Sequence, residues 1–281
     1  MSIDNARLDA ALETARTALL AERVAEGHWE GELSSSALST AVACAAMEHV
    51  QTATGTEEHC ALIQGGLHWL AEHANADGGW GDTTKSLSNI STTTLCWATF
   101  HAVPGALEEH AEVVTAAEQW LKKAAGGVTP DYLAPAIIAR YGKDRTFSVP
   151  ILTHCALAGK GRWKDVIQLP FELAALPRNW FAALRLPVVS YALPALIAIG
   201  QCRHQHRPSW NPFTRVLRNA AREKTLQILE QIQPSNGGFL EATPLTSFVT
   251  MSLAGCGLAD HPVARKGIEF LHASVRADGS W

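Results

Sequence analysis

The sequence lacks the features that mark several large classes of protein. Its six cysteines are scattered without a Cys-x-x-Cys pair, which excludes a disulfide framework and indicates small buried side chains in a reducing compartment. The longest apolar run, residues 186–200, contains two prolines and is too short and too interrupted to span a bilayer. The net charge of −4 gives no basic excess, so we expect no nucleic-acid partner.

What the sequence does contain is a repeated turn, built from glycine, an aromatic residue and then serine or threonine. It occurs in Gly27–Met47, in Ala76–Phe100 and, with Phe239 as the aromatic residue, in Gln233–Gly257; a last copy, ADGSW, ends at Trp281. The aromatic residues are separated by 51, 159 and 42 positions. Because 159 is about three units of ~50 residues, we infer a repeat whose middle copies have diverged.

The chemistry of this turn predicts helical hairpins. Glycine permits positive φ at the end of one helix, the aromatic ring packs over the start of the next, and serine or threonine caps that start. The segments between turns, including residues 113–125, 215–232 and 263–275, have helical periodicity, and strand signals are nearly absent. We therefore predict an all-α protein, an α/α barrel (toroid) of helical hairpins joined by these turns.

The turns resemble the QW repeat, Gln-x3-Gly-x-Trp, of the squalene–hopene and oxidosqualene cyclases, which are the class II triterpene cyclases. Gln233, Gly237 and Phe239 fit this repeat with phenylalanine for tryptophan. Residues 77–80 and 278–281, Asp-Gly-Gly-Trp and Asp-Gly-Ser-Trp, keep its core but lack the glutamine. The residues that we expect to anchor the repeat turns in the core are Trp29, Trp80, Gln233, Phe239 and Trp281.

Two further segments carry the resemblance, which extends over most of the chain. Residues 27–33, GHWEGEL, resemble the family's first Gly-Tyr-Trp-Trp-Gly segment. Residues 161–181 resemble its Pro-Trp…Val-Pro-Pro-Glu…Leu-Pro stretch. The chain departs from the family at Pro187, where squalene–hopene cyclases have a tryptophan, and at Thr40, where they have an acidic residue. Both positions face the cavity in the family, so the identity of the substrate stays open.

The resemblance implies a domain organisation and a set of partners. Residues 1–22 would be the first helix of the catalytic β-domain, and residues 23–281 the non-catalytic α/α-barrel γ-domain, continuing into a catalytic half that lies outside this sequence. The substrate would be a linear isoprenoid such as squalene, cyclised without metal or organic cofactor. We also expect a homodimer and a cytoplasmic location, with monotopic contact at the inner face of the membrane.

The acid that starts such a reaction is missing from these residues. Protonation of an alkene or epoxide requires an unusually strong carboxylic acid, which the family supplies from an Asp-x-Asp-Asp motif. No such motif occurs among the 281 residues, and the sequence stops inside a QW-like turn at Trp281. We therefore expect an N-terminal piece of a longer cyclase that is inactive alone.

Four residues are candidates for the lining of the substrate cavity: Trp163, Glu172, Trp180 and Pro187. The tryptophans flank an irregular proline-rich segment, where core packing is the simpler interpretation. Glu172 lies among apolar residues and needs a partner if it is buried, for which an arginine or a loop amide would be sufficient. The segment 180–200 is interpreted either as a buried connector or as part of the substrate channel or membrane surface.

The sequence also raises the question of a metal site and leaves two alternatives to the cyclase hypothesis. A zinc site at His204 and His206 is disfavoured, because the segment CRHQHRPSW has no nearby carboxylate or second cysteine and is typical of a surface loop. A prenyltransferase β-subunit would need an Asp-Cys-His zinc set, and Asp165, Cys155 and His154 lack its spacing. A stand-alone helical barrel that binds a hydrophobic ligand or partner is the non-enzymatic alternative.

Overall fold

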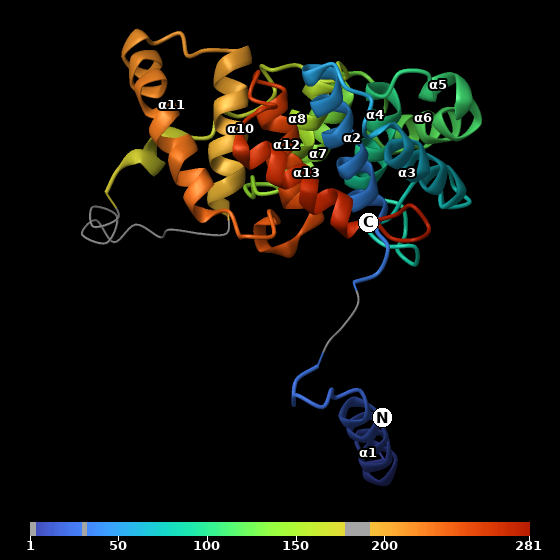
Figure 1. Ribbon diagram of the computed structural model, residues 1–281. Coiled ribbons are helices and arrows are strands. Elements are labelled where there is room, and N and C mark those ends of the chain that lie inside the picture. The colour runs from blue at the N-terminus through green and yellow to red at the C-terminus, as the bar shows by residue number, and fades with distance from the viewer. Residues whose placement is uncertain (1–3, 30–32, 178–191) are drawn as a thin grey trace. The chain divides into compact units, whose positions relative to one another are not determined.

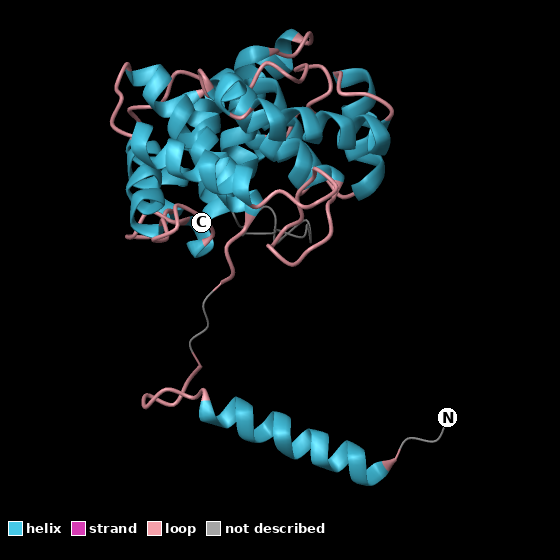
Figure 2. Cartoon of the chain, turned by 90° about the vertical axis from the view of Figure 1, so that its right-hand side faces the viewer, coloured by secondary structure: helices cyan, strands magenta, loops and turns pink. Residues whose placement is uncertain are grey.

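The computed structural model describes residues 4–29, 33–177 and 192–281, and every regular element in these ranges is helical (Figures 1 and 2). The predicted all-α class is therefore confirmed. The α-helices are α1 (Asn5–Ala21), α2 (Ala37–Thr54), α3 (Cys60–Glu72), α4 (Ile90–Ala102), α5 (Ala106–Glu109), α6 (Ala111–Ala125), α7 (Pro130–Tyr141), α8 (Ser148–Leu157), α10 (Leu193–His206), α11 (Pro212–Ile232), α12 (Thr243–Ala254) and α13 (Pro262–Ser274). Two short 3₁₀ helices, η1 (Phe171–Ala175) and η3 (Phe239–Glu241), precede α10 and α12.

The chain divides into two compact units, Met1–Ser34 and Ser35–Trp281. The first unit contains α1, which begins where the side chain of Asp4 accepts a hydrogen bond from the backbone N–H of Ala6 at 3.0 Å. None of the residues of α1 is buried, and its leucines are exposed. The described residues of the first unit thus leave the leucines of this helix uncovered.

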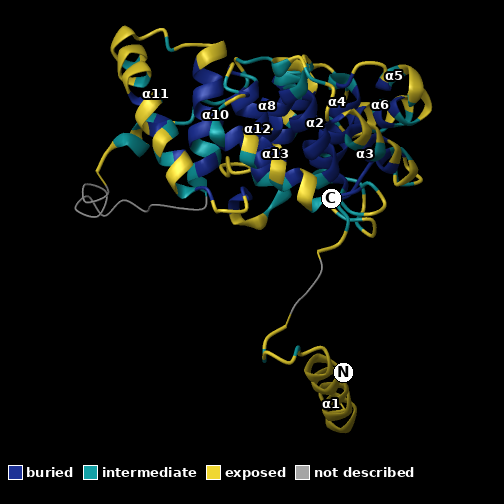
Figure 3. Cartoon of the chain, in the orientation of Figure 1, coloured by how far each residue is buried: buried dark blue, intermediate teal, exposed yellow. Residues whose placement is uncertain are grey.

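The interior of the second unit is formed by helices α2, α4, α8, α10 and α12. In sequence order, each of these five helices contacts the next of the five, and α12 contacts α2, so the contacts close a circuit (Figure 1). The circuit supports the predicted barrel. Most residues of these helices are buried, whereas α3, α6, α11 and α13 bury one face and expose the other (Figure 3).

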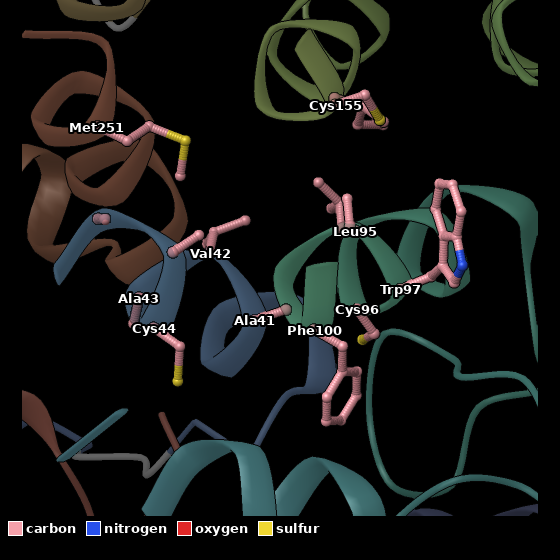
Figure 4. Packing of buried hydrophobic residues seen from close by; sticks show 14 of the residues in the cluster. Ala41, Val42, Ala43, Cys44, Leu95, Cys96, Trp97, Phe100, Cys155 and Met251 are labelled. Atoms are coloured by element: carbon pink, nitrogen blue, oxygen red, sulfur yellow. The ribbon is translucent and has the colours of Figure 1, made fainter. Parts of the chain in front are cut away.

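Small side chains allow the interior helices to approach closely (Figure 4). On α2 the buried run 41–47 consists mostly of alanine, and it packs against α4, which contributes Leu95 and Phe100 to the core. A Cβ atom added at Gly66 of α3 would lie 2.3 Å from the Cys44 sulfur, so α3 also requires a residue without a side chain there.

The cysteines are free, and five of them are buried as the sequence predicts. Burial raises the pKa of both Cys44 and Cys155 to about 12, so these thiols stay protonated and act as packing groups. Cys60 at the start of α3 differs from the prediction because it is exposed.

Candidate functional site

Trp80 is buried in the turn between α3 and α4 and is hydrogen-bonded to both helices. Its indole Nε1 donates to the Leu70 carbonyl of α3 at 2.9 Å, and its backbone N–H donates to the Thr93 hydroxyl of α4 at 3.0 Å. The backbone N–H of Asn89, the N-cap of α4, donates to the Trp80 carbonyl at 3.0 Å. The residue thus joins the end of one helix to the start of the next.

The same three bonds recur at Trp281, but its second helix is α2, near the other end of the chain. The indole Nε1 donates to the Leu271 carbonyl of α13 at 2.8 Å, and the backbone N–H donates to the Thr40 hydroxyl at 3.0 Å. The backbone N–H of Ser36, the N-cap of α2, donates to the Trp281 carbonyl at 2.8 Å. This turn therefore connects the first and last hairpins of the second unit.

Phe239 keeps the backbone part of this pattern. Its N–H donates to the Thr246 hydroxyl at 3.0 Å, and the N–H of Ala242, the N-cap of α12, donates to its carbonyl at 3.0 Å. Gln233 adds two bonds in which its Nε2 donates to the carbonyls of Gly237 and Val263 at 2.9 and 3.0 Å. The glutamine therefore fastens this turn to the first turn of α13.

Two further tryptophans hold the turns from outside, and sequence reasoning missed both. Trp120 Nε1 of α6 donates to Asp77 Oδ2 at 3.0 Å, and Trp69 Nε1 of α3 donates to Asp278 Oδ2 at 3.1 Å. A hydrogen bond from Ser88 lowers the pKa of the Asp77 carboxyl, so the acceptor stays ionised. The paired residues are 43 and 209 positions apart, so no local sequence signal links them.

Trp29 does not occupy the core position that the repeat predicts. It belongs to the first unit, its side chain is about half exposed, and the guanidinium of Arg23 lies 5.5 Å from its ring centroid. Its Nε1 does donate to the Leu19 carbonyl at 2.6 Å, ten positions earlier, which matches the spacing at Trp80 and Trp281. The turn is formed, but the described first unit contains no second helix to bury the ring.

Two of the four cavity candidates are described by the structure. Trp163 is partly buried and stacks on His206 at the end of α10, with ring centroids 4.2 Å apart. Glu172 of η1 is paired with Arg218 of α11, with 3.0 Å between Oε1 and Nε, so the arginine partner that its burial requires is present. The two candidates therefore pack against different helices. Trp180 and Pro187 lie outside the described residues.

The histidine segment is helical, which corrects the surface loop predicted for it. Residues 202–206 form the last turn of α10, and His204 is buried, with its Nε2 bonded to Asn219 at 2.9 Å. Burial lowers the pKa of His204, which keeps it neutral. Among the residues that the structure describes, no group of three or more His, Cys, Asp or Glu side chains could hold a metal ion.

The residues of the prenyltransferase alternative have other partners. Asp165 accepts from Arg162 Nε at 2.8 Å, and His154 Nε2 lies 3.2 Å from both the Thr99 hydroxyl and the Leu95 carbonyl. Cys155 is a buried, protonated thiol. These contacts do not form the zinc set that such a subunit requires.

A hollow of about 620 Å³ lies between the end of α10 and the start of α11. Its wall includes Gln168, Arg203, Arg207, Trp210, Arg215 and Arg218. Arg218 is also the partner of Glu172, so the described cavity candidate and this hollow share one ion pair.

Comparison with known proteins now identifies the family. No protein with a curated description matches the chain. The family model described as the squalene-hopene cyclase N-terminal domain matches residues 12–198, which is more than half of the sequence. The match runs from within α1 into α10 and includes the Trp80 turn and Glu172. The chain therefore belongs to the squalene-hopene cyclase family, with which it shares the N-terminal domain.

Proposed function

We propose that this chain is the structural N-terminal part of a class II terpene cyclase that catalyses proton-initiated polycyclisation of a linear, squalene-like isoprenoid. The observation that carries the proposal is the family match over residues 12–198. The turns at Trp80, Phe239 and Trp281 support it, because they repeat one hydrogen-bond pattern at the positions where the QW-like motifs occur.

The chain's contribution to this reaction is to build and hold a wall, since the Asp-x-Asp-Asp motif is absent from its 281 residues. Carbocation intermediates must be kept from water and stabilised by aromatic faces, each worth about 0.5–2 kcal/mol. Here the ion pair of Glu172 with Arg218 fixes η1 against α11. We propose that η1 and α11 contribute to the wall of the substrate cavity. We assign the proton donor to the catalytic domain of the same enzyme.

We further propose that the start of α11 contacts a membrane surface, from which an insoluble isoprenoid would be taken. Trp210, Phe213, Val216 and Leu217 are all exposed there, and Trp210 and Phe213 are the most exposed aromatic side chains in the described part of the chain. Such aromatic and aliphatic side chains beside arginines are typical of interfacial helices. No helix in the described ranges is long and apolar enough to cross a bilayer.

The reaction is tested by mixing experiments with squalene. The purified chain is incubated with squalene alone and together with a separately produced catalytic half of a squalene-hopene cyclase, and polycyclic products are measured by gas chromatography and mass spectrometry. We expect product only in the mixture. Product from the chain alone would contradict its structural role, and no product in the mixture would favour the non-enzymatic barrel.

The membrane contact is tested by sedimentation with phosphatidylcholine vesicles. The double variant Trp210→Ser/Phe213→Ser should sediment at least about tenfold less than wild type, because it removes two apolar groups that insert into the interface. Tyr132→Ser/Phe147→Ser, which removes two exposed aromatic side chains elsewhere, is the matched control. Equal losses in both variants would refute a contact specific to α11.

A further inference from the structure

The hollow between α10 and α11 is lined by an excess of positive charge. Four arginines line it, Arg203, Arg207, Arg215 and Arg218, and the ion pairs of the described residues supply these four with a single carboxylate partner, Glu172 on Arg218. Three positive charges therefore share one polar hollow without a counter-charge from the described chain.

The sequence around the hollow also lacks acidic residues. Residues 173–222 contain seven arginines and no aspartate or glutamate, although the chain as a whole has a net charge of −4. Charge has thus been segregated to this region. A long acid-free stretch cannot supply a hidden partner from its own side chains.

Arg203 is held in place by the fold, which makes the hollow preorganised. The side chain is buried, its Nε donates to the Val166 carbonyl at 2.8 Å, and its Nη1 donates to the Arg207 carbonyl. Burial and the positive charges of Arg207 and Arg218 lower the pKa of Arg203, so the surroundings disfavour the positive charge of its guanidinium group. An anion in the hollow would relieve that repulsion.

The start of α11 adds to the positive potential. This helix has 21 residues, and its N-terminus at Asn211 directly follows Trp210 at the edge of the hollow. The positive end of the helix dipole therefore adds to the arginine charges. Arg207 and Arg215 are exposed, so their guanidinium groups remain accessible to a ligand.

We propose that this hollow binds a phosphoryl anion, a diphosphate or the phosphate of a lipid headgroup, through Arg203, Arg207, Arg215 and Arg218. Guanidinium groups recognise phosphate oxygens in bidentate fashion, and several of them around one hollow fit a multiply charged ligand better than a single carboxylate. The site lies beside the apolar start of α11 and shares Arg218 with the ion pair of Glu172, but the binding of the anion does not depend on the proposed cyclisation reaction.

The first test titrates inorganic diphosphate into the purified chain at low salt and measures binding by calorimetry. Wild type should bind saturably, and Arg207→Gln/Arg215→Gln should bind at least about tenfold more weakly, because two charge-assisted contacts are lost. The control Arg140→Gln/Arg265→Gln removes two exposed arginines elsewhere and should bind as wild type does. Both changes are at exposed positions, and thermal unfolding checks that each variant is folded.

The second test separates the two sources of phosphate by sedimentation with phosphatidylglycerol and phosphatidylcholine vesicles. Diphosphate binding without a preference for the anionic vesicles assigns a soluble ligand. A preference that disappears in Arg207→Gln/Arg215→Gln, without diphosphate binding, assigns a lipid headgroup. The proposal is overturned if neither ligand binds, or if the control variant loses as much binding as the hollow variant.

Discussion

At the residue scale, two glycines with the same backbone conformation separate the effect of strain from the effect of close packing. Gly237 and Gly257 have φ of +84° and +78°. A Cβ atom at Gly237 would lie 2.1 Å from the Lys266 carbonyl oxygen of α13, whereas nothing lies within 4 Å of one at Gly257. We expect Gly257→Ala to lower the free energy of unfolding by about 1–2 kcal/mol, and Gly237→Ala by roughly 1–3 kcal/mol more. If both variants lose the same free energy of unfolding in urea, close packing of α13 against the turn at Gly237 does not contribute to stability.

His154 makes the stability of the second unit depend on pH. Burial, and then the charge of His49, lowers its pKa from an ordinary value of 6.5 to about 3. Between these values the unfolded chain binds the proton and the folded chain does not. The free energy of unfolding should therefore be fully retained above pH 6.5 and fall by about 1.4 kcal/mol per pH unit below it.

The measurement for His154 is urea unfolding at pH 7 and pH 5. The variant His154→Gln should lose less stability between these two pH values than wild type does, even if it is less stable at both. His68→Gln, at an exposed histidine paired with Glu72, should follow wild type. An unchanged pH dependence in His154→Gln would assign the effect to other groups.

Individual residues also show how far sequence reasoning reaches. Phe239 in a tryptophan position was predictable, because the glycines and the following threonine define the turn locally. The bonds of Trp69 and Trp120 to Asp278 and Asp77 were not, because each joins an outer helix to a distant turn. The arginine partner of Glu172 was predicted by type, from the need to satisfy a carboxylate among apolar residues, but not as Arg218.

At the scale of elements, α10 shows that a proline in an apolar run can still belong to a helix. The run 186–200 contains two prolines, and Pro194 lies in the first turn of α10, where its missing N–H breaks no bond. The helix then continues to His206 and carries His204 into the core. A proline disrupts a helix only when it lies after the first turn. The sequence alone does not determine at which residue α10 begins, so it does not show that Pro194 is tolerated.

The exposed leucines of α1 lead to a prediction about this helix. Leu12 and Leu19 are both more than half exposed, and we expect them to pack on the catalytic domain, to which the family resemblance assigns residues 1–22. Leu12→Ser/Leu19→Ser should leave the urea midpoint of the second unit unchanged, and should reduce cyclised product at least about tenfold in the mixture with the catalytic half. Full product formation by this variant would show that α1 packs elsewhere.

At the scale of the whole molecule, Trp281 adds a bond to α2 where the contact of α12 with α2 closes the circuit of interior helices. Local patterns predict the hairpins, but they do not say which hairpin follows the last turn. Trp281 donates to Thr40, 241 positions away, and α12 contacts α2 beside this bond. Closure of the circuit is therefore a tertiary property, because the repeat motif defines each turn locally but does not specify that the turn at Trp281 pairs with α2.

Because the turn at Trp281 is bonded to α2, we expect a substitution at Trp281 to destabilise the start of α2 as well. The indole is almost buried, and Trp281→Ala should lower the free energy of unfolding by about 3–5 kcal/mol. Trp210→Ala, at a fully exposed tryptophan, should change it by at most about 0.5 kcal/mol.

Hydrogen exchange then distinguishes closure from a local loss of packing. The backbone N–H of Ser36 donates to the Trp281 carbonyl, and the backbone N–H of Trp281 donates to the Thr40 hydroxyl. Both contacts therefore depend on the position of this turn. In Trp281→Ala the amides at the start of α2 should exchange faster, while those of α4, whose turn is held by Trp80, should keep their wild-type protection. Unchanged exchange at α2 would mean that the circuit is maintained by the α2–α12 contact alone, without the turn that Trp281 anchors.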